Sequence, residues 1–159
     1  MKKLEILRKN RVLKELTEEE LQKFSEVVRE RHLPGGAILF REGESGNSMF
    51  IIAYGSVKIM KTSKRGEEEI ATLGTGAMFG ELALIDGSPR SATAVTVEKT
   101  DLLEITREDL QKFFDEYPRI GLKLCLAMSR LITARLRNTT NDLLFIKNLL
   151  KSKTPDIFE

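Results

Sequence analysis

The sequence predicts a mainly β domain, an antiparallel sandwich or barrel of short strands with helices on both flanks. Ten of its 11 glycines lie between Gly35 and Gly87, and short runs of β-prone residues alternate with them. Short strands at such regular spacing are typical of antiparallel sandwiches and barrels. The segments on either side carry helix signals instead. A chain of 159 residues fits a single domain.

The first 33 residues are expected to form a helical segment. Thr17-Glu18-Glu19-Glu20 has the pattern of a capping box, and Leu21, Phe24 and Val28 follow at helical spacing. The start of the chain does not resemble an export signal, because Glu5 and Arg8 interrupt its apolar residues.

Residues 34–106 are expected to form the β region. Its β-prone runs are 37–41, 49–54, 56–61, 69–73, 93–97 and 102–105. Glycines and other turn residues separate most of these runs, which favours antiparallel pairing of neighbouring strands.

Two helices are expected in residues 107–150, followed by a tail at 151–159. Thr106-Arg107-Glu108-Asp109 resembles the first capping pattern, and Pro118 ends the short helix that it starts. A longer helix is predicted from about Arg119 to Leu150. It carries apolar positions at alternating spacings of 4 and 3, interrupted by one threonine: Ile132, Leu136, Thr139, Leu143, Ile146 and Leu150. Such an a/d seam predicts a homodimer, and the alternative is packing of the helix on its own β region.

Composition excludes several classes of partner and site. Lys+Arg 26 against Asp+Glu 24 is too balanced to indicate a nucleic-acid or membrane surface, and no apolar run is long enough to cross a bilayer. The single cysteine, Cys125, is compatible with a reducing cytoplasm and is expected to be buried in the long helix. His32 is the only histidine, so neither a zinc site nor a histidine-based catalytic triad is expected.

The chemistry is concentrated in residues 79–94. Apolar neighbours flank Glu81, so its carboxylate is expected to be partly buried and to need hydrogen-bond donors. Arg90 follows a Gly87-Ser88-Pro89 turn that fixes the backbone. The two side chains could pair with each other. The alternative is a ligand with one negative charge for Arg90 and hydroxyl groups for Glu81, which describes a ribose phosphate.

This segment resembles the phosphate-binding cassette of cyclic nucleotide-binding domains, as in cAMP receptor proteins and protein kinase A regulatory subunits. The resemblance lies in Phe79-Gly80-Glu81-Leu82-Ala83-Leu84 and Pro89-Arg90-Ser91-Ala92, and a weaker likeness runs from about Val12 to about Leu136. It implies an eight-stranded jelly roll, or double-stranded β-helix, with the cassette inserted between strands and a long C-terminal helix.

The resemblance also implies roles for individual residues. Glu81 would accept from the ribose 2′-hydroxyl, and Arg90 would bind the cyclic phosphate. The expected ligand-binding residues are Gly80, Glu81, Leu82, Ala83, Arg90, Ser91 and Ala92, and the candidates for base contacts are Arg135, Asn138 and Thr139. The expected ligand is cAMP. Because the Ser91 hydroxyl could also reach guanine, cGMP is the alternative.

The predicted function is that of a cytoplasmic sensor rather than an enzyme, with no cofactor and no metal. Ligand is expected to shift the long helix against the β region or a dimer mate, and so to act on an unknown downstream protein. Only nine residues follow Leu150, so direct DNA binding through a helix-turn-helix is not expected. Two rivals remain open: a structural module that no longer binds nucleotide, and an enzyme that acts on one.

Overall fold

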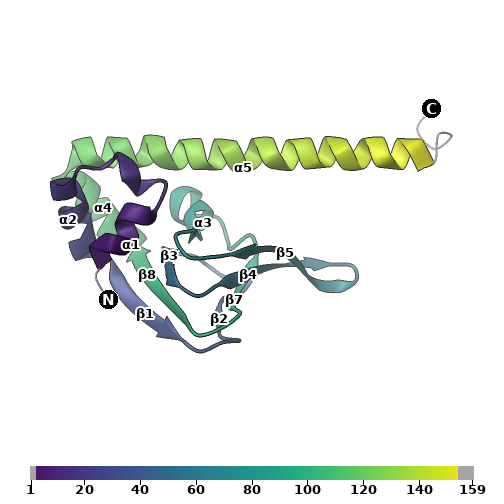
Figure 1. Cartoon of the computed structure of the whole chain (residues 1–159), viewed down its shortest axis with the longest axis horizontal. Helices are drawn as coiled ribbons and strands as arrows, with labels where there is room; N and C mark the ends of the chain where they lie inside the picture. Colours follow the sequence, from purple (N-terminus) through teal and green to yellow (C-terminus); the bar gives the residue numbers. More distant parts are fainter. Residues whose placement is uncertain (1–2, 154–159) are drawn as a thin grey trace.

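The computed structural model describes residues 3–153, in which helices flank two four-stranded antiparallel sheets (Figure 1). The element order is α1 (Lys3–Lys9), the 3₁₀ helix η1 (Leu13–Glu15), α2 (Glu18–Val27), β1 (Arg29–Leu33), β2 (Ile38–Phe40), β3 (Ser48–Tyr54), β4 (Val57–Ser63), β5 (Gly66–Leu73), β6 (Met78–Phe79), α3 (Glu81–Asp86), β7 (Thr93–Thr96), β8 (Thr100–Thr106), α4 (Arg107–Glu116) and α5 (Pro118–Lys153). The sheets have strand orders β1-β8-β3-β6 and β2-β7-β4-β5. The expected jelly roll is confirmed.

Each of the six predicted runs contains or overlaps a strand, and two further strands were not expected. The first of these, β1, corrects the assignment of residues 1–33 to a purely helical segment. Its sequence, Arg-Glu-Arg-His-Leu, lacks apolar alternation, and it is held by its antiparallel pairing with β8 and by ion pairs such as Arg31 to Glu104 at 2.9 Å. The second, β6, has only two residues and is too short to show a period.

Strand β3 is buried on both faces and separates the two parts of the core. Met49 and Ile51 belong to the cluster that the helices cover, whereas Phe50 and Ile52 belong to the cluster inside the roll. This division follows from the period of two along a strand. Inside the roll, the rings of Phe50 and Phe79 stack with their centroids 5.3 Å apart, and this places β6 at the entrance to the cassette.

The helix boundaries follow the predicted signals closely. Thr17 and Glu20 form a complete capping box at the start of α2, and the Thr106 hydroxyl accepts from the amide of Asp109 at 3.1 Å. Pro118 separates α4 from α5, as expected. Helix α5 continues to Lys153 and so includes the first residues of the predicted tail. Residues 154–159 of that tail lie outside the described residues.

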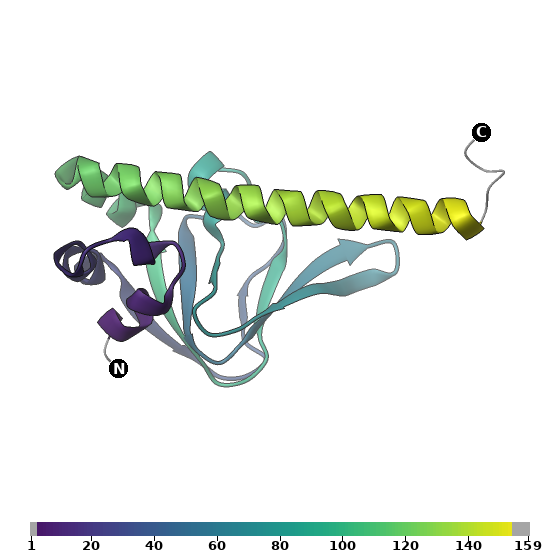
Figure 2. The ribbon, with the colours of Figure 1, turned by 45° about the horizontal axis from the view of Figure 1, so that its top comes forward.

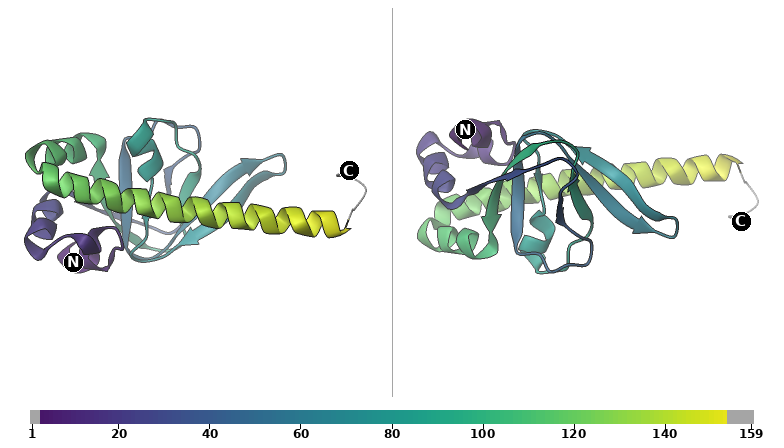
Figure 3. Two further views of the ribbon diagram at one scale, coloured as in Figure 1. Left: turned by 90° about the horizontal axis from the view of Figure 1, so that it is seen from above. Right: turned by 90° about the horizontal axis from the view of Figure 1, so that it is seen from below.

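Helix α5 crosses the domain and then extends past the body of the roll, in the direction in which the β4–β5 hairpin also projects (Figure 2). Seen from above, α3 and α4 lie on one side of its first part and the N-terminal helices lie on the other (Figure 3). Ile120, Leu124 and Met128 bury one face of this part in the helical core cluster. Residues 136–152 are all exposed.

The prediction of a buried thiol is wrong, because Cys125 is exposed. Its neighbour Leu124 faces the core, and successive residues of a helix turn by about 100°. An apolar neighbour in the sequence therefore does not ensure burial of the next residue. Within residues 3–153, no helix has both the length and the hydropathy that crossing a membrane requires.

Candidate ligand-binding site

The cassette begins where the chain leaves β6 and turns into α3. Gly80 has a φ of 78° and so lies in the left-handed region that glycine adopts without strain. A Cβ atom on Gly80 would lie 2.9 Å from Nη1 of Arg90 and 3.3 Å from the carbonyl oxygen of Ser48, so a larger residue would displace the arginine. Glycine at this position thus allows both the turn and the close approach of the arginine.

Arg90 is buried, and its guanidinium has only neutral partners. Nη1 donates to the carbonyl oxygen of Gly80 at 3.0 Å, and Nη2 donates to the Ser48 hydroxyl at 3.3 Å. The guanidinium carbon lies 4.1 Å from the centroid of the Phe40 ring, a cation–π contact. Among the described residues, Nε of Arg90 is a buried nitrogen without a hydrogen-bond partner.

Burial lowers the pKa of the Arg90 guanidinium, and the carboxylates of Glu104 and Glu44 act in the opposite direction. An arginine nevertheless stays charged in a protein. A buried cation without an ion-pair partner is costly, since its desolvation is not offset. The site therefore favours an anion beside Arg90.

The loop that precedes β3 completes the surroundings of Arg90, and the sequence did not reveal this role. A Cβ atom on Gly46 would lie 2.5 Å from Nε of Arg90 and 2.8 Å from Cβ of Ala83. Ser48, two residues on, supplies the hydroxyl described above. Both positions lie more than 40 residues from Arg90 along the chain, so no local motif connects them to the cassette.

Glu81 is also buried, with 2% of its surface exposed, but its partner is not Arg90. Nη1 of Arg135, on α5, donates to Oε1 of Glu81 in a short ion pair. Nη2 of Arg135 donates to the carbonyl oxygen of Met78 at 2.6 Å. Glu81 and Arg90 therefore do not pair with each other in the structure, and the ion pair of Glu81 connects the cassette to α5 instead.

A cavity of about 520 Å³ brings all ten predicted site residues together. The cassette contributes Gly80, Glu81, Leu82, Ala83, Arg90, Ser91 and Ala92, and α5 contributes Arg135, Asn138 and Thr139. The volume lies within the usual range of small-molecule sites. The two segments that the resemblance implied, more than 40 residues apart in the chain, therefore line the same cavity.

The opposite wall of the cavity is apolar, and its strand residues were not predicted. It is formed by Phe40, Ile59, Ile70, Ala71 and Leu73 from β2, β4 and β5. Ile70 and Ala71 are consecutive and both line the cavity, because a β-bulge interrupts the β4–β5 register at this point, so a period of two could not have predicted this wall. The cavity thus offers a cation for an anion, a carboxylate for hydroxyl groups, and an apolar surface for a planar ring.

A jelly roll with such a cavity between its cassette and a long helix defines a binding domain for a small anionic ligand. The sequence model of the cyclic nucleotide-binding domain matches residues 30–117, more than half of the chain. The chain belongs to the cyclic nucleotide-binding domain family.

Relatives and solved structures agree with this family. The "Cyclic AMP receptor protein" of Thermus thermophilus is 34% identical over 116 residues, which cover 72% of this chain and 54% of that protein. A cyclic nucleotide-binding domain from Methylobacillus flagellatus superposes with a TM-score of 0.80 at 31% identity, over 89% of this chain and 80% of that one.

A third similar structure is the regulatory domain of Toxoplasma gondii PKA, crystallised with cAMP. It has a TM-score of 0.65 at 30% identity and covers 70% of this chain and 42% of that one. The chain spans about half the length of the receptor-type relatives that it matches.

Proposed function

We propose that this chain is a cyclic nucleotide sensor whose ligand is cAMP. The observation that carries the proposal is the buried Arg90 guanidinium, which borders the cavity and has no carboxylate partner among the described residues. One cation suits the single negative charge of a cyclic phosphodiester. The names of the Thermus thermophilus relative and of the Toxoplasma gondii complex, both of which refer to cAMP, support this choice of ligand.

The three parts of a cyclic nucleotide have complementary surfaces in the cavity. Arg90 binds the phosphate, and the Glu81 carboxylate accepts from the ribose 2′-hydroxyl while it keeps its ion pair with Arg135. The base lies against the apolar wall, between Ile70 and α5, where Asn138 and Thr139 can reach its polar edge. Ser91 also lines the cavity, and its hydroxyl keeps cGMP as the second candidate ligand.

The ligand is bound and released unchanged, without a cofactor or metal. The titratable side chains that line the cavity are Glu81, Arg90 and Arg135. Arginine does not act as a base at neutral pH, and the only carboxylate is engaged by Arg135. A cavity whose one lining carboxylate among the described residues is held in an ion pair favours a sensor over an enzyme that acts on nucleotides.

The sensor acts in the cytoplasm as a homodimer through the a/d seam of α5, and its downstream protein is unidentified. Three seam residues are strongly exposed: Leu136 and Leu143 at 65% each, and Ile146 at 52%. The exposed Cys125 lies seven residues before Ile132, so it falls on the continuation of the same seam. Large exposed apolar stripes at heptad spacing are typical of helix pairs.

Calorimetric titration with cAMP and with cGMP tests the ligand. Wild-type protein, shown by absorbance to be free of nucleotide, should bind cAMP in the micromolar range or tighter. Arg90→Ala should weaken binding about 10- to 150-fold, because a charge-assisted contact contributes about 1.5 to 3 kcal/mol. Arg65→Ala, on the exposed tip of the β4–β5 hairpin, is the matched control and should bind like wild type.

The outcomes of this titration separate the competing functions. Tighter binding of cGMP would change the ligand and keep the sensor. No heat with either nucleotide would favour a structural module, and conversion of the nucleotide, detected by mass spectrometry, would favour an enzyme.

Light scattering at micromolar concentration tests the dimer. Wild-type protein should have twice the mass of the chain, and Leu143→Asp should have the monomer mass, because it places a charge in the seam. Asn141→Asp, which adds a negative charge on the opposite side of the helix from Leu143, serves as the control for a change of charge. A wild-type monomer would refute the homodimer.

A further inference from the structure

Arg107, the first residue of α4, touches both halves of the nucleotide site from outside the cavity. Nη2 of its guanidinium donates to the carbonyl oxygen of Ala83 in α3. Its backbone amide donates to the carbonyl oxygen of Asn47 at 2.7 Å. Arg107 does not line the nucleotide cavity, so it cannot act by touching a ligand there.

The contact with Ala83 fixes a helix that is too short to be stable alone. Helix α3 has six residues and ends at Gly87, whose amide donates to the same Ala83 carbonyl at 3.1 Å. Isolated helices of this length do not persist in water. A cation at the C-terminal end of a helix also interacts favourably with the helix dipole. Because Glu81 lies only two residues before Ala83, holding this end of α3 also holds the carboxylate.

The contact with Asn47 reaches the other half of the site. Asn47 lies between Gly46, which packs against Nε of Arg90, and Ser48, which accepts from Nη2 of Arg90. One residue therefore joins the loop that surrounds Arg90 to the helix that carries Glu81. Through α4, the same residue is connected to the start of α5.

We propose that Arg107 is a positioning residue, which sets the placement of Glu81 relative to Arg90 and so determines the affinity for the nucleotide. This inference rests on the proposed function, because it concerns the same cavity. Substitution of Arg107 tests only the contact of its guanidinium with Ala83. Every replacement except proline keeps the backbone amide that donates to Asn47. The residue is exposed, so its substitution does not open the core.

The test compares Arg107→Ala, Arg107→Lys and a control in cAMP calorimetry. Arg107→Ala should weaken binding about tenfold, the size of one charge-assisted hydrogen bond. Arg107→Lys should recover most of the affinity, because an ammonium can still donate to one carbonyl. The control is Arg29→Ala, which removes an exposed arginine that pairs with Asp109 of α4 at 2.8 Å and has no recorded contact with α3.

Hydrogen exchange in the absence of nucleotide provides a second measurement. Arg107→Ala should raise the exchange rate of the Gly87 amide and its α3 neighbours several-fold, with the amides of β3 and β8 unchanged. A purely structural role would accelerate exchange in the strands as well.

The outcomes distinguish this inference from the proposed function. If the wild type binds cAMP and Arg107→Ala binds equally well, the inference is overturned and the function stands. If the wild type binds no cyclic nucleotide, the function and the effect on affinity both fail. Exchange then tests the remaining part of the inference: faster exchange confined to α3 shows that Arg107 holds this helix, and unchanged or general acceleration overturns that part as well.

Discussion

The two halves of α5 belong to one helix but differ in what they contact. In residues 118–135, Leu124 and Met128 lie in the core, and three ion pairs connect the helix to η1, α2 and the cassette. In residues 136–152, every residue is exposed, and several of them are large and apolar. Tertiary packing provides most of the stability of helices in proteins. Contacts within the chain therefore stabilise the first half, whereas large apolar side chains of the second half, such as Leu136 and Leu143, are exposed.

This difference assigns separate roles to the two halves. Arg135 of the first half contacts the cassette, and Asn138 and Thr139 at the start of the second half also line the cavity, so we expect α5 to respond to the ligand around the junction. In the proposed dimer, exposed apolar residues of the second half such as Leu143 and Ile146 would pass a change of position to the other chain. Arg135 lies at the junction of the two halves.

The largest expected effect is on stability and separates the halves directly. Leu124→Ala should lower the free energy of unfolding by about 2 to 4 kcal/mol, because it leaves a cavity where the side chain is 2% exposed. Leu143→Ala should change it by less than about 0.5 kcal/mol, because that side chain is already 65% exposed. Urea denaturation followed by circular dichroism measures both, at concentrations at which the protein is monomeric. Equal losses would contradict the division of the helix.

A smaller effect is expected at the junction itself. Arg135→Ala should weaken cAMP binding about five- to tenfold, because the cavity loses a cation and Glu81 keeps an unbalanced charge near the ligand's phosphate. The matched control is Arg130→Ala, which removes another α5 arginine whose partner, Glu15, lies outside the cavity. Calorimetry of both variants tests this. If both lose affinity equally, the first half acts as a whole rather than through Arg135.

The sequence predicted the β-rich fold class, the starts of α2 and α4 and the break at Pro118, and the family resemblance implied the candidate site residues. Glycine spacing, two threonine caps and Pro118 are local signals, and the structure uses each of them where it was expected. The cassette residues and the three α5 positions implied by the resemblance line one cavity, and their contacts with a ligand stay a prediction. Local chemistry predicts local structure well because a cap or a turn needs only a few neighbouring residues.

The features that the sequence did not predict depend on contacts between distant segments. Gly46 and Ser48 reach Arg90, and Ile70 reaches the cavity, only because the roll brings separate strands together. Strand β1 has no apolar period and depends on β8. Cys125 was wrongly predicted to be buried because the prediction relied on its apolar neighbours in the chain. Burial on a helix depends instead on the angular position of the residue around the helix axis.

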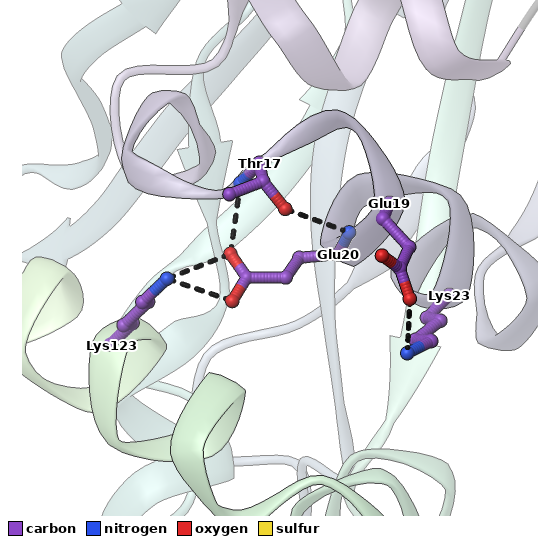
Figure 4. A network of polar contacts seen from close by, with 5 residues as sticks. All are labelled: Thr17, Glu19, Glu20, Lys23 and Lys123. Carbon is purple, nitrogen blue, oxygen red and sulfur yellow. Dashed lines mark hydrogen bonds and ion pairs between the residues drawn. The ribbon is translucent and has the colours of Figure 1, made fainter.

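The smallest expected effect concerns the ion pair that joins α2 to the first half of α5. Figure 4 shows Glu20 at the centre of this contact: its carboxylate accepts from Nζ of Lys123 at 2.7 and 2.9 Å and from the amide of Thr17 at 2.8 Å. The hydrogen bond from Lys123, followed by that from Thr17, lowers the pKa of Glu20. The first half of α5 is therefore held partly by charge, through Lys123, Arg130 and Arg135.

Glu20→Gln tests this contribution, because glutamine preserves the capping box and removes only the charge. Because the pKa of the Glu20 carboxyl is lower in the folded than in the unfolded state, its ionisation stabilises the protein at pH values above the unfolded pKa, about 4.3. This stabilisation is lost as the pH falls through the folded pKa. The free energy of unfolding of wild type should therefore exceed that of Glu20→Gln by about 0.5 kcal/mol at pH 6, and the difference should disappear near pH 3. Glu19→Gln is the control, since Glu19 pairs with Lys23 inside α2 and not with α5. Denaturation of the three proteins at both pH values measures the effect, and a pH-independent difference would mean that packing alone holds α5 against α2.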